Sequence, residues 1–125
     1  MKKSLEKIAV AWDARIGASV FTTVDKNNVP NSIYVKSISK YNDNIYLVAD
    51  NYFNKTRENL KSGCQGSILF MVDETEAYQI KGVVKYETEG VYFDNMKSWN
   101  NPKRPGHAVA VLQVVEIYRG GEKLY

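Results

Sequence analysis

The stretch Tyr46-Leu-Val-Ala-Asp-Asn-Tyr-Phe-Asn-Lys-Thr-Arg-Glu-Asn-Leu60 decides the fold, because it joins a strand to a helix through a short polar loop. Ile45–Ala49 is an apolar run bounded by polar turn residues, and this pattern predicts a strand. Lys55–Ser62 is predicted to form a helix that ends at Gly63, a residue type that commonly follows helix C-termini. Asn54 is the predicted N-cap residue of that helix.

The first turn of this helix carries cations where most helices carry acidic residues. Lys55, Thr56 and Arg57 follow the cap, and the partial positive charge of a helix N-terminus repels cations unless an anion lies between them. Backbone N–H groups, a hydroxyl and one or two cations together make a phosphate site. Lys55 and Thr56 are therefore candidate phosphate ligands, and the alternative is an ordinary exposed helix start. Arg57 points about 100° away from Thr56 around the helix and is expected to be solvated.

The rest of the chain alternates strand patterns with turns and two further helices. We predict helices over Ser4–Trp12 and Val91–Asn100. Besides Ile45–Ala49, the predicted strands are Ala18–Val24, Asn31–Lys40, Ser67–Val72, Ala77–Thr88 and His107–Tyr118. Six mostly antiparallel strands with short helices indicate a mainly β protein built as a small barrel, and an open sheet with helices on one side fits the same pattern.

Several local features refine this prediction. Asn28 is expected in the left-handed conformation of a turn, and Gly82 interrupts an alternating strand as a bulge or bend would. Ser67–Val72 is almost uninterruptedly apolar, so both of its faces are expected to be covered. Residues 1–125 read as one domain, with loose ends at 1–4 and 120–125.

Composition narrows the possible functions. The 125 residues are 44% hydrophobic and 25% charged, and a net charge of +3 is too small to argue for nucleic acid as a partner. The lone Cys64 excludes an intramolecular disulfide and fits a cytoplasmic protein. No apolar run approaches the roughly 18 residues of a membrane span, so neither a membrane nor secretion is expected. A single histidine, His107, argues against a histidine-based triad or a multi-histidine metal site.

Three segments in order carry a resemblance to a known family. Val48–Leu60, preceded by Val29–Lys36, resembles the FMN-binding split barrel of the pyridoxamine 5′-phosphate oxidase superfamily, especially its small single-domain members close to bacterial FMN-binding protein. Tyr78–Gly82 and Ala108–Tyr118 continue the match, which covers about residues 5–119. The resemblance implies a six-stranded antiparallel split barrel that binds FMN and forms a homodimer with the flavin near the interface.

The resemblance also implies roles for individual residues. Lys55 and Thr56 match the family's lysine and hydroxyl residue that hold the FMN phosphate, and Asn54 stands where many relatives have arginine or serine. Lys36 is implied near the flavin ring or the substrate, although a lysine lying along the sheet is equally compatible with the pattern. Gln79 would reach the ligand, often across the dimer interface, or would be a surface glutamine. Backbone groups that would meet the edge of the flavin belong to Asn31, Ser32, Ile33, Tyr34, Val35, Val48 and Ala49.

The function that follows is a small flavin-dependent oxidoreductase acting on a small-molecule substrate or electron donor. The alternative is a non-catalytic FMN module for electron transfer or flavin storage. FMN is expected ahead of F420 or haem, which other relatives use. Pyridoxamine phosphate oxidation itself is not expected, because the arginine, tyrosine and serine cluster and the arginine–histidine pair of those enzymes have no counterpart here. Tyr92, Trp99, His107 and Cys64 are expected to have structural roles, and no catalytic residue is assigned.

Overall fold

The computed structural model describes residues 2–125, with side chains described from residue 5 onward. In that part of the chain the elements are, in order, α1 (Lys2–Asp13), β1 (Ile16–Val24), β2 (Pro30–Val35), β3 (Ile38–Asn42), β4 (Ile45–Asp50), α2 (Lys55–Lys61), β5 (Cys64–Met71), β6 (Ala77–Glu87), α3 (Val91–Trp99), β7 (Ala108–Arg119) and β8 (Glu122–Lys123). None of the helices described is long and apolar enough to cross a bilayer.

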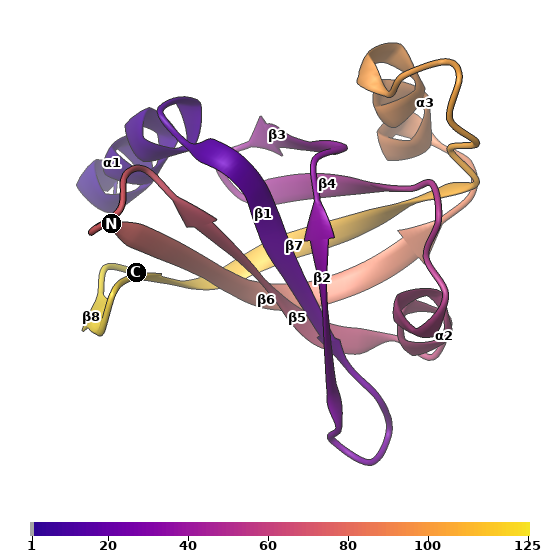
Figure 1. The fold of residues 1–125 in the computed structure, drawn as a ribbon, viewed down its shortest axis with the longest axis horizontal. Coiled ribbons are helices and arrows are strands. Elements are labelled where there is room, and N and C mark those ends of the chain that lie inside the picture. The colour runs from indigo at the N-terminus through magenta and orange to yellow at the C-terminus, as the bar shows by residue number, and fades with distance from the viewer. Residues whose placement is uncertain (1) are drawn as a thin grey trace.

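The described strands form one antiparallel sheet in the order β2-β1-β5-β6-β7-β4-β3, with β8 paired to β7. Strands β2 and β3 occupy opposite edges of this sheet, yet only Lys36 and Ser37 separate them in the chain. The sheet therefore curls until its two edges meet at one seam, which is the split of the barrel (Figure 1). The predicted mainly β split barrel is confirmed, with eight strands rather than six.

One of the two additional strands arises because the predicted strand Asn31–Lys40 is broken. The chain turns at Lys36 and Ser37, where the Ile38 amide donates to the Lys36 carbonyl and the Ala49 amide donates to the Ser37 carbonyl. This turn rotates the following residues, so Ile38 is buried although the alternation places it with the exposed Tyr34 and Lys36. The break allows the chain to leave β1 and pair with β4.

The other additional strand lies in the C-terminal segment. Residues 120–125 were expected to be loose, but β8 pairs with the end of β7, and the amides of Leu124 and Tyr125 donate to the Ile117 carbonyl. At the other terminus helix α1 begins at Lys2, so residues 2–4 are helical, and Met1 lies outside the described residues.

The barrel interior holds the main hydrophobic core, and α1 closes one end of it. Trp12 of α1 meets Tyr46 and Phe70 edge-to-face, with ring centroids 4.9 and 5.0 Å apart. Both chain termini lie at this end, whereas α2 and α3 lie at the opposite end (Figure 1). Edge-to-face aromatic contacts add to the free energy of burial, so α1 stabilises the barrel through Trp12.

A second, smaller core explains why the β4 residues before Asp50 are all apolar or aromatic. Leu47 and Ala49 point away from the barrel interior and pack with Met96 of α3 and with Val109 and Val111 of β7. Tyr46 and Val48 point into the main core. Strand β4 is therefore buried on both faces, as its continuous apolar run indicates.

Strand β5 differs from this expectation. The predicted strand Ser67–Val72 was expected to be covered on both faces, but the observed β5 alternates, and Leu69 and Met71 are 39% and 41% exposed. No helix of the described chain covers the outer face of β5, because α2 and α3 lie at one end of the barrel (Figure 1). The apolar run therefore leaves an exposed apolar surface.

Two predicted backbone features are confirmed. Asn28 has a φ of 63° in the β1–β2 turn. The register of β6 against β7 shifts between Lys81 and Gly82. A Cβ atom at Gly82 would lie 1.9 Å from the Gln113 carbonyl oxygen, so only glycine permits this close approach of the two strands.

Candidate functional site

A cavity of about 450 Å³ opens at the split of the barrel, between β2 and the loop that joins β4 to α2. We call it the split cavity. Its size lies within the range of about 300–1,000 Å³ that is typical of small-molecule sites. It brings together nine of the residues singled out from the sequence: Asn31, Ile33, Tyr34, Val35, Lys36, Ala49, Asn54, Lys55 and Thr56.

Three singled-out residues have side chains elsewhere. The Ser32 hydroxyl shares a hydrogen bond of 2.8 Å with that of Thr22, and Val48 is fully buried in the core. The resemblance implicates only the backbone groups of Ser32 and Val48 in flavin binding. The positions of their side chains therefore do not test that prediction. Gln79 lies on the outer face of the sheet, away from the split cavity.

Five residues of the split cavity were not singled out from the sequence: Ser37, Asn51, Tyr52, Phe53 and Arg104. Asn51, Tyr52 and Phe53 lie within the strand–loop–helix stretch, so their position in that loop was the available signal. Arg104 had no such signal, because it belongs to an irregular segment between two prolines far along the chain.

One end of the split cavity offers a cation and a hydroxyl. The Thr56 hydroxyl accepts a hydrogen bond of 3.0 Å from the side-chain amide of Asn31, so its own proton remains available for donation. The Lys55 ammonium lies 3.4 Å from the Glu58 carboxylate and 3.9 Å from that of Asp25. The Asn54 side chain makes no capping hydrogen bond to α2. Lys55 and Thr56 both line the cavity, with the Lys55 ammonium turned toward Glu58 and Asp25.

The loop behind this end is anchored by an ion pair. Arg57 donates two hydrogen bonds, of 2.7 and 2.9 Å, to the buried carboxylate of Asp50. Tyr86 and the Phe53 amide also donate to Asp50. Burial would raise the pKa of Asp50, but the donated hydrogen bonds and the Arg57 charge hold it below its usual value. The expectation that Arg57 is simply solvated is wrong, because Asp50 turns toward α2 at the end of β4.

A second set of hydrogen bonds fixes the loop that carries Arg104. The buried amides of Asn51 and Asn100 pair reciprocally, at 2.8 and 3.1 Å. Asn51 also donates to the Ser37 hydroxyl at 3.0 Å and accepts from the Gly106 amide at 3.0 Å. The segment after α3 is therefore held against the β4–α2 loop, and this brings Arg104 to the lining of the split cavity.

All the charged residues that line the split cavity are cationic. The lining contains Lys36, Lys55 and Arg104 but no aspartate or glutamate. Within the described part of the chain, neither Lys36 nor Arg104 forms an ion pair. Lys55 is paired with Glu58 and Asp25, which lie outside the lining, so the unbalanced positive charge that attracts an anion comes from Lys36 and Arg104.

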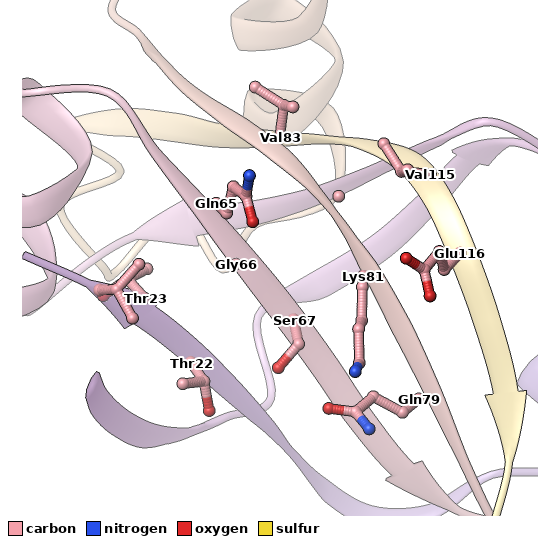
Figure 2. Close-up of a pocket in the computed structure, with 12 residues that line it drawn as sticks. Thr22, Thr23, Gln65, Gly66, Ser67, Gln79, Lys81, Val83, Val115 and Glu116 are labelled. Carbon is pink, nitrogen blue, oxygen red and sulfur yellow. The ribbon is translucent and has the colours of Figure 1, made fainter. Parts of the chain in front are cut away.

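A different cavity, of about 350 Å³, lies on the outer face of β1, β5, β6 and β7. We call it the outer-face cavity. Figure 2 shows Thr22, Ser67, Gln79 and Lys81 gathered toward one end of it, with Val83 and Val115 toward the other. The two valines are 45% and 55% exposed. Lys81 and Glu116 both line this cavity, so its charges are mixed, unlike those of the split cavity.

The remaining candidates have structural surroundings. Trp99 packs against the second core and donates its indole N–H to Asn95 at 3.0 Å, and Tyr92 meets Tyr41 edge-to-face. The His107 amide donates to the Asp50 carbonyl. Burial raises the pKa of the Cys64 thiol, so it is a poor nucleophile. Among the described residues, no group of three or more histidine, cysteine, aspartate or glutamate side chains is placed to hold a metal ion.

Comparison with known proteins identifies a family that matches this chain. A family described as pyridoxamine 5′-phosphate oxidase matches residues 6–119. An uncharacterised protein of Methanocaldococcus jannaschii, MJ0282, is 28% identical over 101 residues, which cover 77% of this chain and 68% of that protein.

Two solved structures share the fold. The HupZ protein of Group A Streptococcus superposes with a TM-score of 0.78 at 23% identity, over 91% of each chain. An FMN-binding protein from Syntrophomonas wolfei superposes with a TM-score of 0.75 at 23% identity, over 94% of this chain and 86% of the other. Both comparisons support the split-barrel architecture over nearly the whole chain.

Proposed function

Because the chain belongs to the pyridoxamine 5′-phosphate oxidase family, we propose that it is a flavoprotein that binds FMN in the split cavity and acts as a small oxidoreductase. The observation that carries this proposal is the cavity itself, where Lys55 and Thr56 stand at one end and Lys36 and Arg104 complete a lining without carboxylates. FMN is a phosphorylated, planar molecule, so it needs both a phosphate site and a wide slot.

The phosphate end fits the group that it would hold. A phosphate monoester carries between one and two negative charges at neutral pH, and its oxygens accept hydrogen bonds. Lys55 supplies a cation, and Thr56 supplies a hydroxyl whose proton is free because Asn31 donates to its oxygen. Binding requires Lys55 to turn from Glu58 and Asp25 toward the phosphate, which exchanges two exposed ion pairs for one charge-assisted hydrogen bond.

The strand edge and apolar residues of the split cavity, which form the slot, suit the isoalloxazine ring of FMN. Strand β2 is an edge strand, so part of its backbone hydrogen-bonding capacity is not used by β1. The edge of an isoalloxazine ring alternates donors and acceptors, which peptide groups match without requiring particular side chains. The apolar lining comes from Ile33 and Val35 of β2 and Ala49 of β4. Two exposed tyrosines also line the cavity, Tyr34 with 81% and Tyr52 with 72% of its surface exposed.

Bound FMN would supply hydride or single-electron transfer, and the protein would place it and tune its reduction potential. Lys36 lines the slot and has no ion-pair partner among the described residues. Its charge would favour the reduced, anionic ring over the oxidised, neutral one. This effect distinguishes an oxidoreductase from a protein that only stores flavin.

We propose further that two copies of the chain associate through the outer face of the sheet. Leu69, Met71, Val83 and Val115 expose apolar surface there, and surfaces of this kind commonly mark protein contacts. Gln79 lies on the same face, where a residue that reaches a flavin across an interface must lie (Figure 2). A cytoplasmic location completes the proposal, since the single cysteine suits a reducing compartment.

The direct experiment is to purify the protein, record its absorbance spectrum, and identify the released cofactor by mass spectrometry. FMN at about one molecule per chain would support the proposal. A colourless protein that also fails to take up FMN in a fluorescence titration would overturn it. Recovery of a deazaflavin or haem would show that the cofactor is not FMN. Turnover with a reduced nicotinamide donor and an acceptor would separate the oxidoreductase from a storage or electron-transfer module.

A further inference from the structure

A third cavity, open and of about 340 Å³, adjoins the split cavity, and we call it the Trp99 cavity. The two cavities share Lys36, Ser37 and Arg104, whereas Lys55 and Thr56 line only the split cavity. The Trp99 cavity therefore continues from the part of the split cavity that Lys36 and Arg104 line. Its other lining residues are Ile38, Ser39, Trp99 and Asn101.

The shared cations are not explained by the FMN phosphate. That group has Lys55 and Thr56, which are absent from the Trp99 cavity. Lys36 and Arg104 have no ion pair within the described chain, and no aspartate or glutamate lines either cavity. Both cations line the Trp99 cavity without a carboxylate beside them, so a bound anion would balance their charge.

Hydrogen bonds fix the backbone of the loop that carries Arg104. Besides the Asn51–Asn100 amide pair, the Arg104 amide donates to the Asn101 carbonyl, and the Lys97 ammonium donates to the Pro105 carbonyl at 3.1 Å. Gly106 has a φ of 53°, and a Cβ atom there would lie 2.8 Å from Lys97 Nζ. A fixed backbone lowers the entropic cost of using Arg104 as a ligand.

Trp99 contributes a half-buried, largely apolar indole to the lining of the cavity. Its indole N–H is already used by Asn95, so the ring has no free hydrogen-bond donor to offer to a ligand. Ser39 and Asn101 supply neutral polar groups at the margin. An indole beside two cations matches a molecule with a flat apolar body and one acidic group.

We propose that the Trp99 cavity is the substrate subsite, where Arg104, assisted by Lys36, binds the carboxylate of a small organic acid whose flat body lies against Trp99. This inference rests on the proposed function, because the subsite holds a substrate only if the adjoining split cavity holds the flavin. Arg104 is the specificity-determining residue of the subsite, since a planar guanidinium binds a carboxylate through two parallel hydrogen bonds.

Benzoate is a suitable probe, with benzamide as its neutral counterpart of nearly equal shape. The two indole N–H signals of the ¹⁵N-labelled protein, assigned with Trp99→Phe, report on Trp99 and on the buried Trp12 separately. Benzoate should shift the Trp99 signal in a saturable way and leave the Trp12 signal in place, and benzamide should bind much more weakly. The titration is run with the FMN-loaded protein and repeated with the protein free of FMN.

Arg104→Gln should weaken benzoate binding by about tenfold, the low end for loss of a charge-assisted hydrogen bond at an open site. Lys103→Gln is the matched control, because it removes one positive charge from the same loop at an exposed residue that lines neither cavity. Benzoate affinity in Lys103→Gln should stay within about twofold of wild type, the range of a screened long-range charge effect.

Equal binding of benzoate and benzamide, or equal losses in the two variants, would overturn the proposal. Preference for phenyl phosphate over benzoate at Trp99 would overturn the carboxylate assignment. Failure of the protein to bind FMN would contradict the proposed function instead, and the titration without FMN would still show whether Arg104 captures a carboxylate.

Discussion

The Asp50 carboxylate and the Arg57 guanidinium meet through two hydrogen bonds, of 2.7 and 2.9 Å, across the loop that joins β4 to α2. Asp50 is fully buried, and the Arg57 side chain is 32% exposed. The pair ties the start of α2 to the end of the strand before it. It therefore holds the position of Lys55 and Thr56, which lie in the first turn of that helix.

Asp50→Asn should destabilise the fold by about 3 kcal/mol, the low end for breaking a buried ion pair because Arg57 can be rehydrated. The folded state lowers the pKa of Asp50, so its contribution is present above the unfolded-state pKa of about 4 and is lost as the pH falls through the lower folded-state value. Urea unfolding from pH 2 to pH 7 should therefore show a weaker loss of stability toward acid in the variant than in wild type.

Asp43→Asn provides the control for this experiment. It breaks the exposed Lys40–Asp43 pair, whose atoms are 2.9 Å apart, and removes the same charge. An exposed pair contributes about 0–1 kcal/mol, so this variant should unfold close to wild type. Equal destabilisation in the two variants would show that the Asp50–Arg57 pair does not anchor the loop.

Glu58→Gln should tighten FMN binding by about twofold, because an exposed pair one helical turn apart contributes at most about 0.5 kcal/mol. The Glu58 carboxylate holds the Lys55 ammonium at 3.4 Å and competes with the phosphate for it. Quenching of FMN fluorescence on titration measures the change. Glu74→Gln, in the exposed turn before β6, removes the same charge far from Lys55 and should leave the affinity unchanged. Weaker binding in Glu58→Gln would contradict this view of Lys55.

Val83→Asp should convert the proposed dimer to a monomer, because it places a charge in the apolar surface of the outer face. Light scattering at micromolar concentration gives the mass directly. Val91→Asp is the control, since Val91 is 62% exposed and begins α3, where an acidic residue is favourable. A wild-type protein that is monomeric with flavin bound would contradict the proposed dimer.

Lys36→Met should lower the flavin midpoint potential and leave the affinity for oxidised FMN nearly unchanged. The substitution keeps an apolar stem of similar length but removes a charge that favours the reduced, anionic ring. Lys36 is exposed, so solvent screens the interaction and the shift should be on the order of 20 mV. A spectroelectrochemical titration measures it. Identical potentials in wild type and variant would mean that Lys36 does not approach the ring.

The strand–loop–helix stretch and the β-rich architecture followed from local pattern. Apolar runs and turn residues act over a few positions, so β4, α2 and the turn at Asn28 were predictable. The nine residues that gather in the split cavity came from the same local motifs and from the family that they resemble.

Features that depend on distant contacts were not predictable in this way. Arg104 reaches the cavity only because Asn100 pairs with Asn51, 49 positions earlier in the chain. The break at Lys36 and Ser37 is set by the pairing of β3 with β4, and the apolar pattern of the segment continues through it. The role of Arg57 depends on the direction in which Asp50 turns, which spacing alone does not specify.

The comparison of FMN with riboflavin in Lys55→Ala tests the central claim most directly. If Lys55 holds the phosphate, the variant should lose about tenfold or more in affinity for FMN, the effect of one charge-assisted hydrogen bond, and almost none for riboflavin, which lacks the phosphate. Lys61→Ala, at the other end of α2, should bind both flavins as wild type does. Equal losses for FMN and riboflavin in Lys55→Ala would contradict the assignment of the phosphate to this end of the split cavity.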